Sequence, residues 1–263
     1  MYKVTSYKNI IQDTEPWHSL RKTPGQLNSS SIYKYLGNRC RDRPERKNYG
    51  KRTKVVQYRE RIHGEIEHPP EEVSEFLQNI FDQGHEGEKR VKEICSDVLE
   101  ETSYYVVESE NCSLRVGVSP DSRFNTGVDG VKCYIPVEIK TQTVGNDWYM
   151  PPLKYQYQLL WQCIALGSNE GIIVRLCRDD TIQRWKFRWD IHAYYEAFEN
   201  FYINMDNEEA DKTKLCSYDL FNLHAYRLPW EDMGVIKYFE YDKYNVEDFS
   251  DVIYPKCGRK VDS

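Results

Sequence analysis

One stretch of the chain combines a strand-like sequence with an alternation of apolar and charged side chains. Residues 134–140 read Tyr-Ile-Pro-Val-Glu-Ile-Lys. Because successive side chains of a β-strand point to opposite faces, Val137 and Ile139 lie on one face of this strand, and Glu138 and Lys140 lie on the other. The stretch therefore predicts a strand that gives one face to an apolar core and turns an acid and a base toward the same space.

A second acid stands where it can join this pair. Asp121 follows the strand-like run 114–118 and precedes Glu138 by seventeen residues. If Asp121 ends the neighbouring strand, its carboxylate converges with Glu138 and Lys140. Two carboxylates supply the oxygen ligands that Mg²⁺ prefers, and bound Mg²⁺ or Mn²⁺ provides the activated water and the charge neutralisation that phosphodiester hydrolysis needs. A surface strand with alternating charges is the alternative interpretation.

A third acid lies on a predicted helix, at 85–99. Val91, Cys95 and Val98 recur there at helical spacing, and Glu88 falls on the same inward face. A carboxylate that points at a core is costly unless it is paired or bound to a metal. Glu88 is therefore a candidate metal ligand, directly or through a water, and a position at the solvent edge of the face is the alternative.

Further signals predict the rest of the secondary structure. We expect irregular chain before residue 29, helices at 29–36, 71–81, from Pro151-Pro152 to Gly167 and from Asp190 to 204, and strands at 104–107, 114–118, 171–177 and 182–189. Gly84 is expected to end one helix before the next begins, and residues after 206 to be irregular chain packed on the domain. On the helix after Pro152, Tyr155, Gln158 and Gln162 lie on one side. These elements predict an α/β (α+β) fold with a central mixed β-sheet flanked by helices.

Composition and charge narrow the class of protein. The chain has 263 residues, 40% of them hydrophobic, which suits one good-sized domain. It shows no apolar run long enough to cross a bilayer and no apolar signal-peptide core, so we expect a soluble intracellular protein. The net charge of -6 argues against a protein that coats nucleic acid.

The charge is unevenly distributed. Residues 39–61 contain ten basic and three acidic residues, a net charge of +7 that leaves −13 for the rest of the chain. A basic segment on an acidic body suits an enzyme that contacts phosphates along one face and then releases them. A solvated loop is the alternative.

The eight cysteines are widely spaced. They lie at positions 40, 95, 112, 133, 163, 177, 216 and 257, with no CxxC pair. A zinc ribbon or an iron–sulfur cluster built on that spacing is therefore not expected, and free thiols are.

Six short motifs follow one another between residues 17 and 167. They are Trp17-His18-Ser19-Leu20-Arg21, Leu27-Asn28-Ser29-Ser30-Ser31-Ile32, Gly84-x-x-x-Glu88, Ser119-Pro120-Asp121, Val137-Glu138-Ile139-Lys140 and Tyr155-Gln156-Tyr157-Gln158. In this order they resemble the motifs of the phage lambda exonuclease family, also called the YqaJ-like viral recombinase family, among the PD-(D/E)XK nucleases. Each motif is weak alone, whereas the ordered set is specific.

The resemblance implies a restriction-endonuclease-like PD-(D/E)XK core and a set of roles. The implied metal ligands are Asp121, Glu138, the backbone carbonyl of Ile139 and, directly or through water, Glu88. Lys140 would be the catalytic lysine, Gln158 would support the site, and Tyr155 would contact DNA. Arg21 and Ser30 would bind a DNA 5′ phosphate, with Ser29 and Ser31 as alternatives to Ser30. Where the family follows its E-x-K motif with Cys-Pro, this chain has Thr141-Gln142.

The implied function is that of an exonuclease dependent on Mg²⁺ or Mn²⁺. It would degrade one strand of linear duplex DNA from a 5′-phosphate end, in recombination or DNA processing in a viral setting, with a single-strand annealing protein as a partner by analogy. An endonuclease for DNA or RNA, of the alkaline-nuclease type, and a catalytically inactive nucleic-acid-binding protein are the alternatives.

The resemblance also suggests how the chain is organised. We expect a single nuclease domain, 1–263, with a DNA-end-gripping segment at 17–37, a basic insert at 39–61, a catalytic core at 84–190 and a C-terminal packing extension at 206–263.

Overall fold

The computed structural model of the protein describes residues 1–32, 74–127, 133–142, 148, 150–178, 181–206 and 231–237. The basic insert 39–61 lies outside these residues, as do positions 33–36 of the helix predicted at 29–36. Residues 29–31 form a turn.

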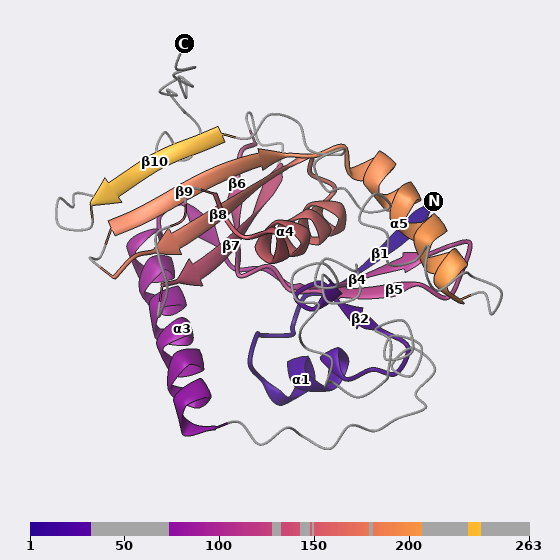
Figure 1. Cartoon of the computed structure of the whole chain (residues 1–263), viewed down its shortest axis with the longest axis horizontal. Coiled ribbons are helices and arrows are strands. Elements are labelled where there is room, and N and C mark those ends of the chain that lie inside the picture. The colour runs from indigo at the N-terminus through magenta and orange to yellow at the C-terminus, as the bar shows by residue number, and fades with distance from the viewer. Residues whose placement is uncertain are drawn as a thin grey trace, which may run out of the picture.

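A six-stranded mixed sheet forms the larger layer of the described structure (Figure 1). Its strand order is β10-β9-β8-β7-β6-β3, and β7 and β8 are parallel while the other neighbours are antiparallel. The strands are β3 (Leu99–Glu100), β6 (Ser122–Asn125), β7 (Tyr134–Thr141), β8 (Glu170–Leu176), β9 (Thr181–Arg188) and β10 (Glu231–Lys237). The parallel pair requires a crossover, which is helix α4 (Leu153–Leu166).

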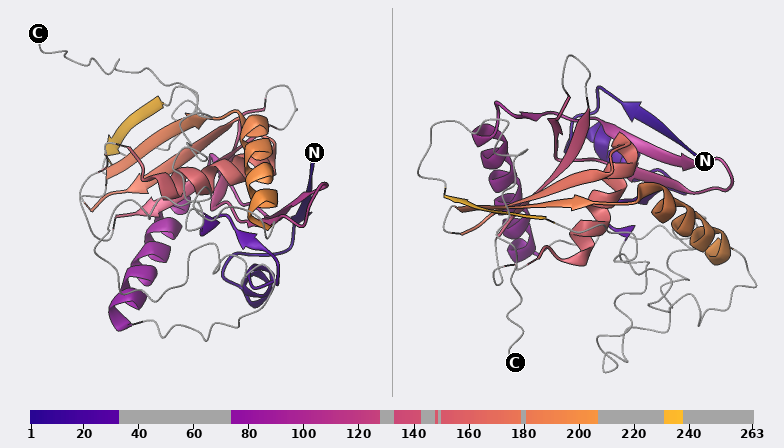
Figure 2. Two further views of the ribbon diagram at one scale, coloured as in Figure 1. Left: turned by 45° about the vertical axis from the view of Figure 1, so that its right-hand side comes forward. Right: turned by 90° about the horizontal axis from the view of Figure 1, so that it is seen from above.

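A smaller sheet of four strands lies beside it in the order β1-β4-β5-β2. These strands are β1 (Tyr2–Tyr7), β2 (Leu27–Asn28), β4 (Tyr104–Ser109) and β5 (Arg115–Val118). Helix α1 (Glu15–Arg21) packs on this sheet, with Trp17 against Tyr104 and Val106. Helix α5 (Ile191–Asp206) also lies beside this sheet (Figure 2). The rings of Tyr2 and Tyr195 lie 4.5 Å apart between their centroids.

Two helices cover opposite faces of the large sheet. Helix α3 (Glu75–Ile94) and the chain after it pack on one face, where Val91 meets Val137 and Ile139. Helix α4 packs on the other face, where Leu160 belongs to the same cluster as Ile173. The alternation along β7 thus confirms the predicted strand: its apolar side chains face α3, and Glu138 and Lys140 face the side of α4.

The predicted fold class, helices flanking a central mixed β-sheet, is confirmed. The helix after Pro152 ends at Gly167, which adopts a left-handed conformation with φ 64°. Asp190 caps α5, because its Oδ1 accepts a hydrogen bond of 3.0 Å from the N–H of Ala193. The five described cysteines are free thiols. Within the described ranges, no helix combines the length and apolar character that crossing a bilayer requires.

Several local predictions are wrong. The helix predicted at 85–99 ends at Ile94, and Leu99 begins strand β3. Gly84 does not break a helix, because α3 runs through it from Glu75 to Ile94; packing against the sheet offsets the cost of about 1 kcal/mol that a glycine imposes. The first 28 residues are not irregular, since they form β1, α1 and β2. Residues 231–237 form strand β10 rather than irregular chain. Both β1 and β10 are edge strands whose partners are distant in sequence, so local patterns carry little signal for them.

Helix α3 approaches β7 closely at Gly87. A Cβ at this position would lie 2.1 Å from Thr141 Oγ1 and 2.9 Å from Thr141 Cβ, so glycine allows the helix to reach the strand. The Thr141 hydroxyl also donates to the Gly84 carbonyl, at 3.2 Å. Thr141, which stands where the resembled family has cysteine, therefore docks the helix that carries Glu88.

Two alanine substitutions test this docking. Gly87→Ala should lower the free energy of unfolding by about 1–3 kcal/mol, because the new methyl group overlaps Thr141. Gly84→Ala is the matched control: nothing lies within 4 Å of its added Cβ, so it should stabilise the helix by about 0.5–1 kcal/mol. Urea denaturation measures both, and shifts of the two midpoints in the same direction would contradict the docking.

Candidate active site

The first acid lies where the pairing of β6 with β7 ends. The last paired residues are Ser122 and Val137. Beyond them the Pro120 carbonyl accepts a hydrogen bond from Thr102 Oγ1 at 2.7 Å, and the Asp121 carboxylate takes the place of a strand partner. Its Oδ2 accepts a hydrogen bond of 2.7 Å from the N–H of Ile139. Since the N–H and C=O of one strand residue point to the same side, the Ile139 carbonyl faces the same edge as Asp121.

The second acid and the lysine complete a compact charged group. Glu138 is 0% exposed and Asp121 is 7% exposed. The Lys140 ammonium forms an ion pair with Glu138 Oε1 and lies 3.8 Å from Asp121 Oδ2. The lysine side chain is 22% exposed, so Lys140 is the member of this group that reaches solvent.

Helix α4 supplies a neutral partner for the buried acid. Gln162 Nε2 donates to Glu138 Oε2 and lies 3.4 Å from the carbonyl oxygen of Ser119. The structure thus brings Gln162 to Glu138, whereas Gln158, expected there from the resemblance, is half-buried one turn earlier on α4. Gln162 is visible in the sequence as the third polar residue on the side of α4 that carries Tyr155. The Tyr155 ring lies 5.3 Å from Lys140 Nζ.

The charges of the group are strongly coupled. Burial raises the pKa of Glu138, the charge of Asp121 raises it further, and Lys140 and Gln162 lower it, leaving it at about 8. Burial alone lowers the pKa of Lys140, but the two carboxylates outweigh it and raise that pKa overall. Burial followed by the charge of Asp121 raises the pKa of Glu88, against the opposing effects of Lys92 and Lys140. The pKa of Glu88, on helix α3, therefore depends on the charges of Asp121 and Lys140.

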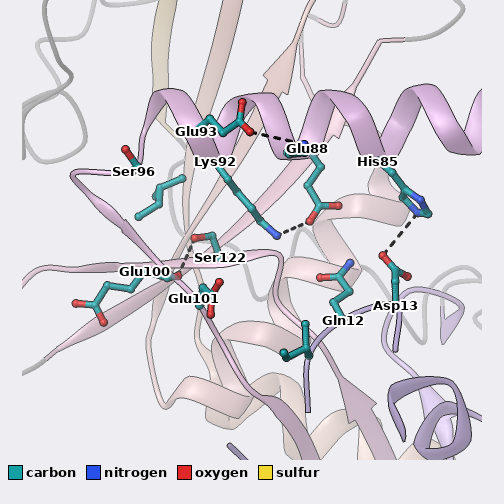
Figure 3. A pocket seen from close by; sticks show the side chains of 13 residues that line it. Gln12, Asp13, His85, Glu88, Lys92, Glu93, Ser96, Glu100, Glu101 and Ser122 are labelled. Carbon is teal, nitrogen blue, oxygen red and sulfur yellow. Dashed lines mark hydrogen bonds and ion pairs between the residues drawn. The ribbon is translucent and has the colours of Figure 1, made fainter. Parts of the chain in front are cut away.

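A groove of about 690 Å³ opens beside Glu88 (Figure 3). Glu88 and Lys92 both project into it from α3, and Lys92 Nζ lies 2.6 Å from Glu88 Oε1. The opposite wall is the segment 11–13, and Ser122, the neighbour of Asp121, also lines the groove. The groove therefore gives solvent access to Glu88 and reaches Ser122, next to Asp121 in the chain.

The N-terminal segment reaches the same region. Arg21 Nη2 donates to Ser30 Oγ at 3.1 Å, and its guanidinium carbon lies 4.3 Å from the centroid of the Trp17 ring. Trp17 Nε1 donates to Ser119 Oγ at 3.1 Å. Strand β2 runs parallel to β5, and the N–H of Ser29 donates to the Gly117 carbonyl at 2.9 Å. The Arg21–Ser30 pair is thus fixed beside the end of β5, which leads directly to Asp121.

The donor set fits a hard divalent cation. Asp121, Glu138 and the Ile139 carbonyl offer oxygen atoms, which Mg²⁺ binds together with several waters. In the described part of the chain, no three His, Cys, Asp or Glu side chains form a complete metal-binding cluster. Two carboxylates, a carbonyl and solvent are the combination in which Mg²⁺ keeps part of its hydration.

No protein-family model matches the sequence, and no curated protein matches it. Solved structures similar to the chain include an alkaline exonuclease (LHK-Exo) from Laribacter hongkongensis, at 16% identity and a TM-score of 0.46, covering 73% of this chain and 93% of that chain. They also include SSO0001, at 14% identity and a TM-score of 0.35, covering 76% of this chain and 85% of that chain. The interpretation of the site depends on its own side chains.

The raised pKa of Glu138 predicts a pH-dependent stability in the absence of divalent metal. Between the ordinary value of 4.5 and about 8, the folded protein holds a proton that the unfolded chain releases, so the free energy of unfolding falls as pH rises through this window. Lys140 contributes only above its ordinary value of 10.5, outside the window. Urea denaturation in EDTA should show this decline for the wild type and a flatter profile for Glu138→Gln. Parallel profiles would refute the assignment.

Proposed function

We propose that the chain is a Mg²⁺-dependent nuclease that hydrolyses one strand of linear duplex DNA from a 5′-phosphate end. The observation that carries the proposal is the meeting of Asp121, Glu138 and Lys140 at the end of the β6–β7 pairing, with the ammonium in contact with Glu138 and 3.8 Å from Asp121. A structural ion pair needs one acid for one base, whereas two buried acids around one lysine leave one carboxyl without a cationic partner, which a divalent cation would supply.

Each residue has a defined task in this proposal. Asp121, Glu138 and the Ile139 carbonyl would hold Mg²⁺, which would supply charge neutralisation at the phosphate and an acidified water. Lys140 orients the attacking water and stabilises the negative charge that develops on the phosphate oxygens. Gln162 holds the Glu138 carboxylate in one orientation through its hydrogen bond. Glu88 lines the groove, where its carboxylate would hold water for the metal site.

The Arg21–Ser30 pair supports action at a DNA end. A guanidinium presents a fork of N–H donors that matches phosphate oxygens, and a hydroxyl adds one more donor. The pair is linked to the acids through Ser119, whose hydroxyl accepts from Trp17. A terminal phosphate bound there would be connected to the hydrolytic group through Trp17 and Ser119, which favours an exonuclease over an enzyme that cuts internally.

Removal of the lysine tests the hydrolytic assignment. Lys140→Ala should lower the cleavage rate of 5′-phosphorylated linear duplex DNA in Mg²⁺ by about 10²-fold or more, because charge stabilisation of the transition state is lost. Lys3→Ala, which removes an exposed lysine of β1, is the control and should retain the wild-type rate. Equal product from wild type and Lys140→Ala, or none from either, would remove the proposal.

The end-binding pair has a separate test. The wild type should cut DNA with a 5′ phosphate faster than the same DNA with a 5′ hydroxyl, and Arg21→Ala should reduce that preference by about tenfold or more, since a charge-assisted hydrogen bond is lost. Arg115→Ala is the matched control, because this arginine lies on β5 of the small sheet, on which α1 packs, with its Nε 3.0 Å from Glu108 Oε1. An unchanged preference in Arg21→Ala would exclude the pair as the phosphate site.

A further inference from the structure

A row of two aromatic rings between two cations extends from Lys140 across the end of the large sheet. In the parallel pairing of β7 with β8, Lys140 lies opposite Arg175. Two rings lie between the charged ends of the row: Tyr155, 5.3 Å from Lys140 Nζ, and Trp148, whose centroid lies 5.3 Å from that of Tyr155 and 4.4 Å from the Arg175 guanidinium carbon. No motif of the sequence includes Trp148 or Arg175.

The Trp148 ring packs against the buried Arg175 and is still partly exposed. Arg175 is 0% exposed, and its Nη1 donates to Gln183 Oε1 at 3.0 Å, so its guanidinium is fixed. A buried cation against a ring face is stabilised by the ring quadrupole, which gives Trp148 a defined orientation. Trp148 also lies 6.1 Å from the buried Trp185, between ring centroids. A ring fixed in this way loses little freedom when a second flat group stacks on it.

We propose that Trp148, together with Tyr155, stacks unpaired nucleobases of the DNA strand that passes the active site. The inference rests on the proposed function and names a binding mode for it. Proteins that bind single strands combine aromatic rings for the bases with cations for the backbone. Here the exposed Lys154, with its Nζ 4.5 Å from the centroid of the Tyr155 ring, supplies a further cation beside the two rings.

The position of the row agrees with a DNA strand that is already bound by its terminal phosphate. The Arg21–Ser30 pair lies beside the end of β5, the acids lie at β6 and β7, and the row continues to β8. A DNA strand bound at its terminal phosphate beside β5 and cut at the acids of β6 and β7 would therefore reach the rings near β8 next. Stacking there keeps the bases out of the duplex while the backbone lies at the acids.

The test separates contacts with bases from contacts with phosphates. Binding of two short single-stranded oligodeoxynucleotides is measured by fluorescence anisotropy in EDTA, so that neither is cut; one carries bases and the other is abasic with the same phosphates. The wild type should prefer the strand with bases, and Trp148→Leu should weaken binding of that strand by about tenfold while binding of the abasic strand is unchanged. Trp148→Phe, which keeps a smaller ring, should give an intermediate affinity.

Tyr134→Leu is the matched control. Tyr134 is a half-buried ring with the Arg123 guanidinium carbon 3.9 Å from its centroid, but it lies at the opposite end of β7 from Lys140. It should leave both affinities unchanged. A wild type without preference for the strand with bases, or a Trp148→Leu variant that weakens both strands equally or neither, overturns the inference.

Should Trp148→Leu fail to fold, as judged by thermal unfolding, Trp148→Phe decides: an affinity for the strand with bases equal to that of the wild type overturns the inference. A preference for bases that Trp148→Leu abolishes, in a protein that cuts no DNA with or without Lys140, would support the stacking site and remove the nuclease.

Discussion

The structure is organised around one ammonium group between two buried carboxylates. Glu138 is completely enclosed, and an isolated charge in that position would be very costly. Lys140 and Gln162 compensate for that cost from the strand and from α4. Asp121 is fixed by the N–H of Ile139, so neither acid is free to turn away. Strand β7 and helix α4 keep these polar atoms within hydrogen-bonding distance of one another.

The topology explains why the group can form at all. The parallel pairing of β7 with β8 requires a crossover, and the crossover helix α4 places Gln162 over Glu138. The link from β5 to β6 crosses from the small sheet to the large one, and Asp121 lies in it. Helix α3 approaches the opposite face closely because Gly87 lacks a side chain. Contacts from α4, from the link between β5 and β6, and from α3 therefore meet at the end of β7.

Which features could be predicted from the sequence depends on how far apart in the chain the interacting residues lie. The alternation along 134–140 is local, so the strand, its core face and the shared orientation of Glu138 and Lys140 were predictable. The continuity of α3 through Gly84 depends on a contact with Thr141, more than fifty residues away, and local helix rules could not contain it. Gln162 and Gln158 both lie on the correct side of α4, and only the packing distance distinguishes them. Trp148 carries no local signal, because its neighbours in the row come from other elements.

Ser119 joins two parts of the molecule through different atoms. Its hydroxyl accepts from Trp17 in α1, and its carbonyl lies 3.4 Å from the Gln162 amide that also holds Glu138. A short relay of hydrogen bonds thus runs from the segment beside the Arg21–Ser30 pair to the buried acid. If a DNA terminus binds at the Arg21–Ser30 pair as proposed, these hydrogen bonds connect its binding site to the position of the Glu138 carboxylate.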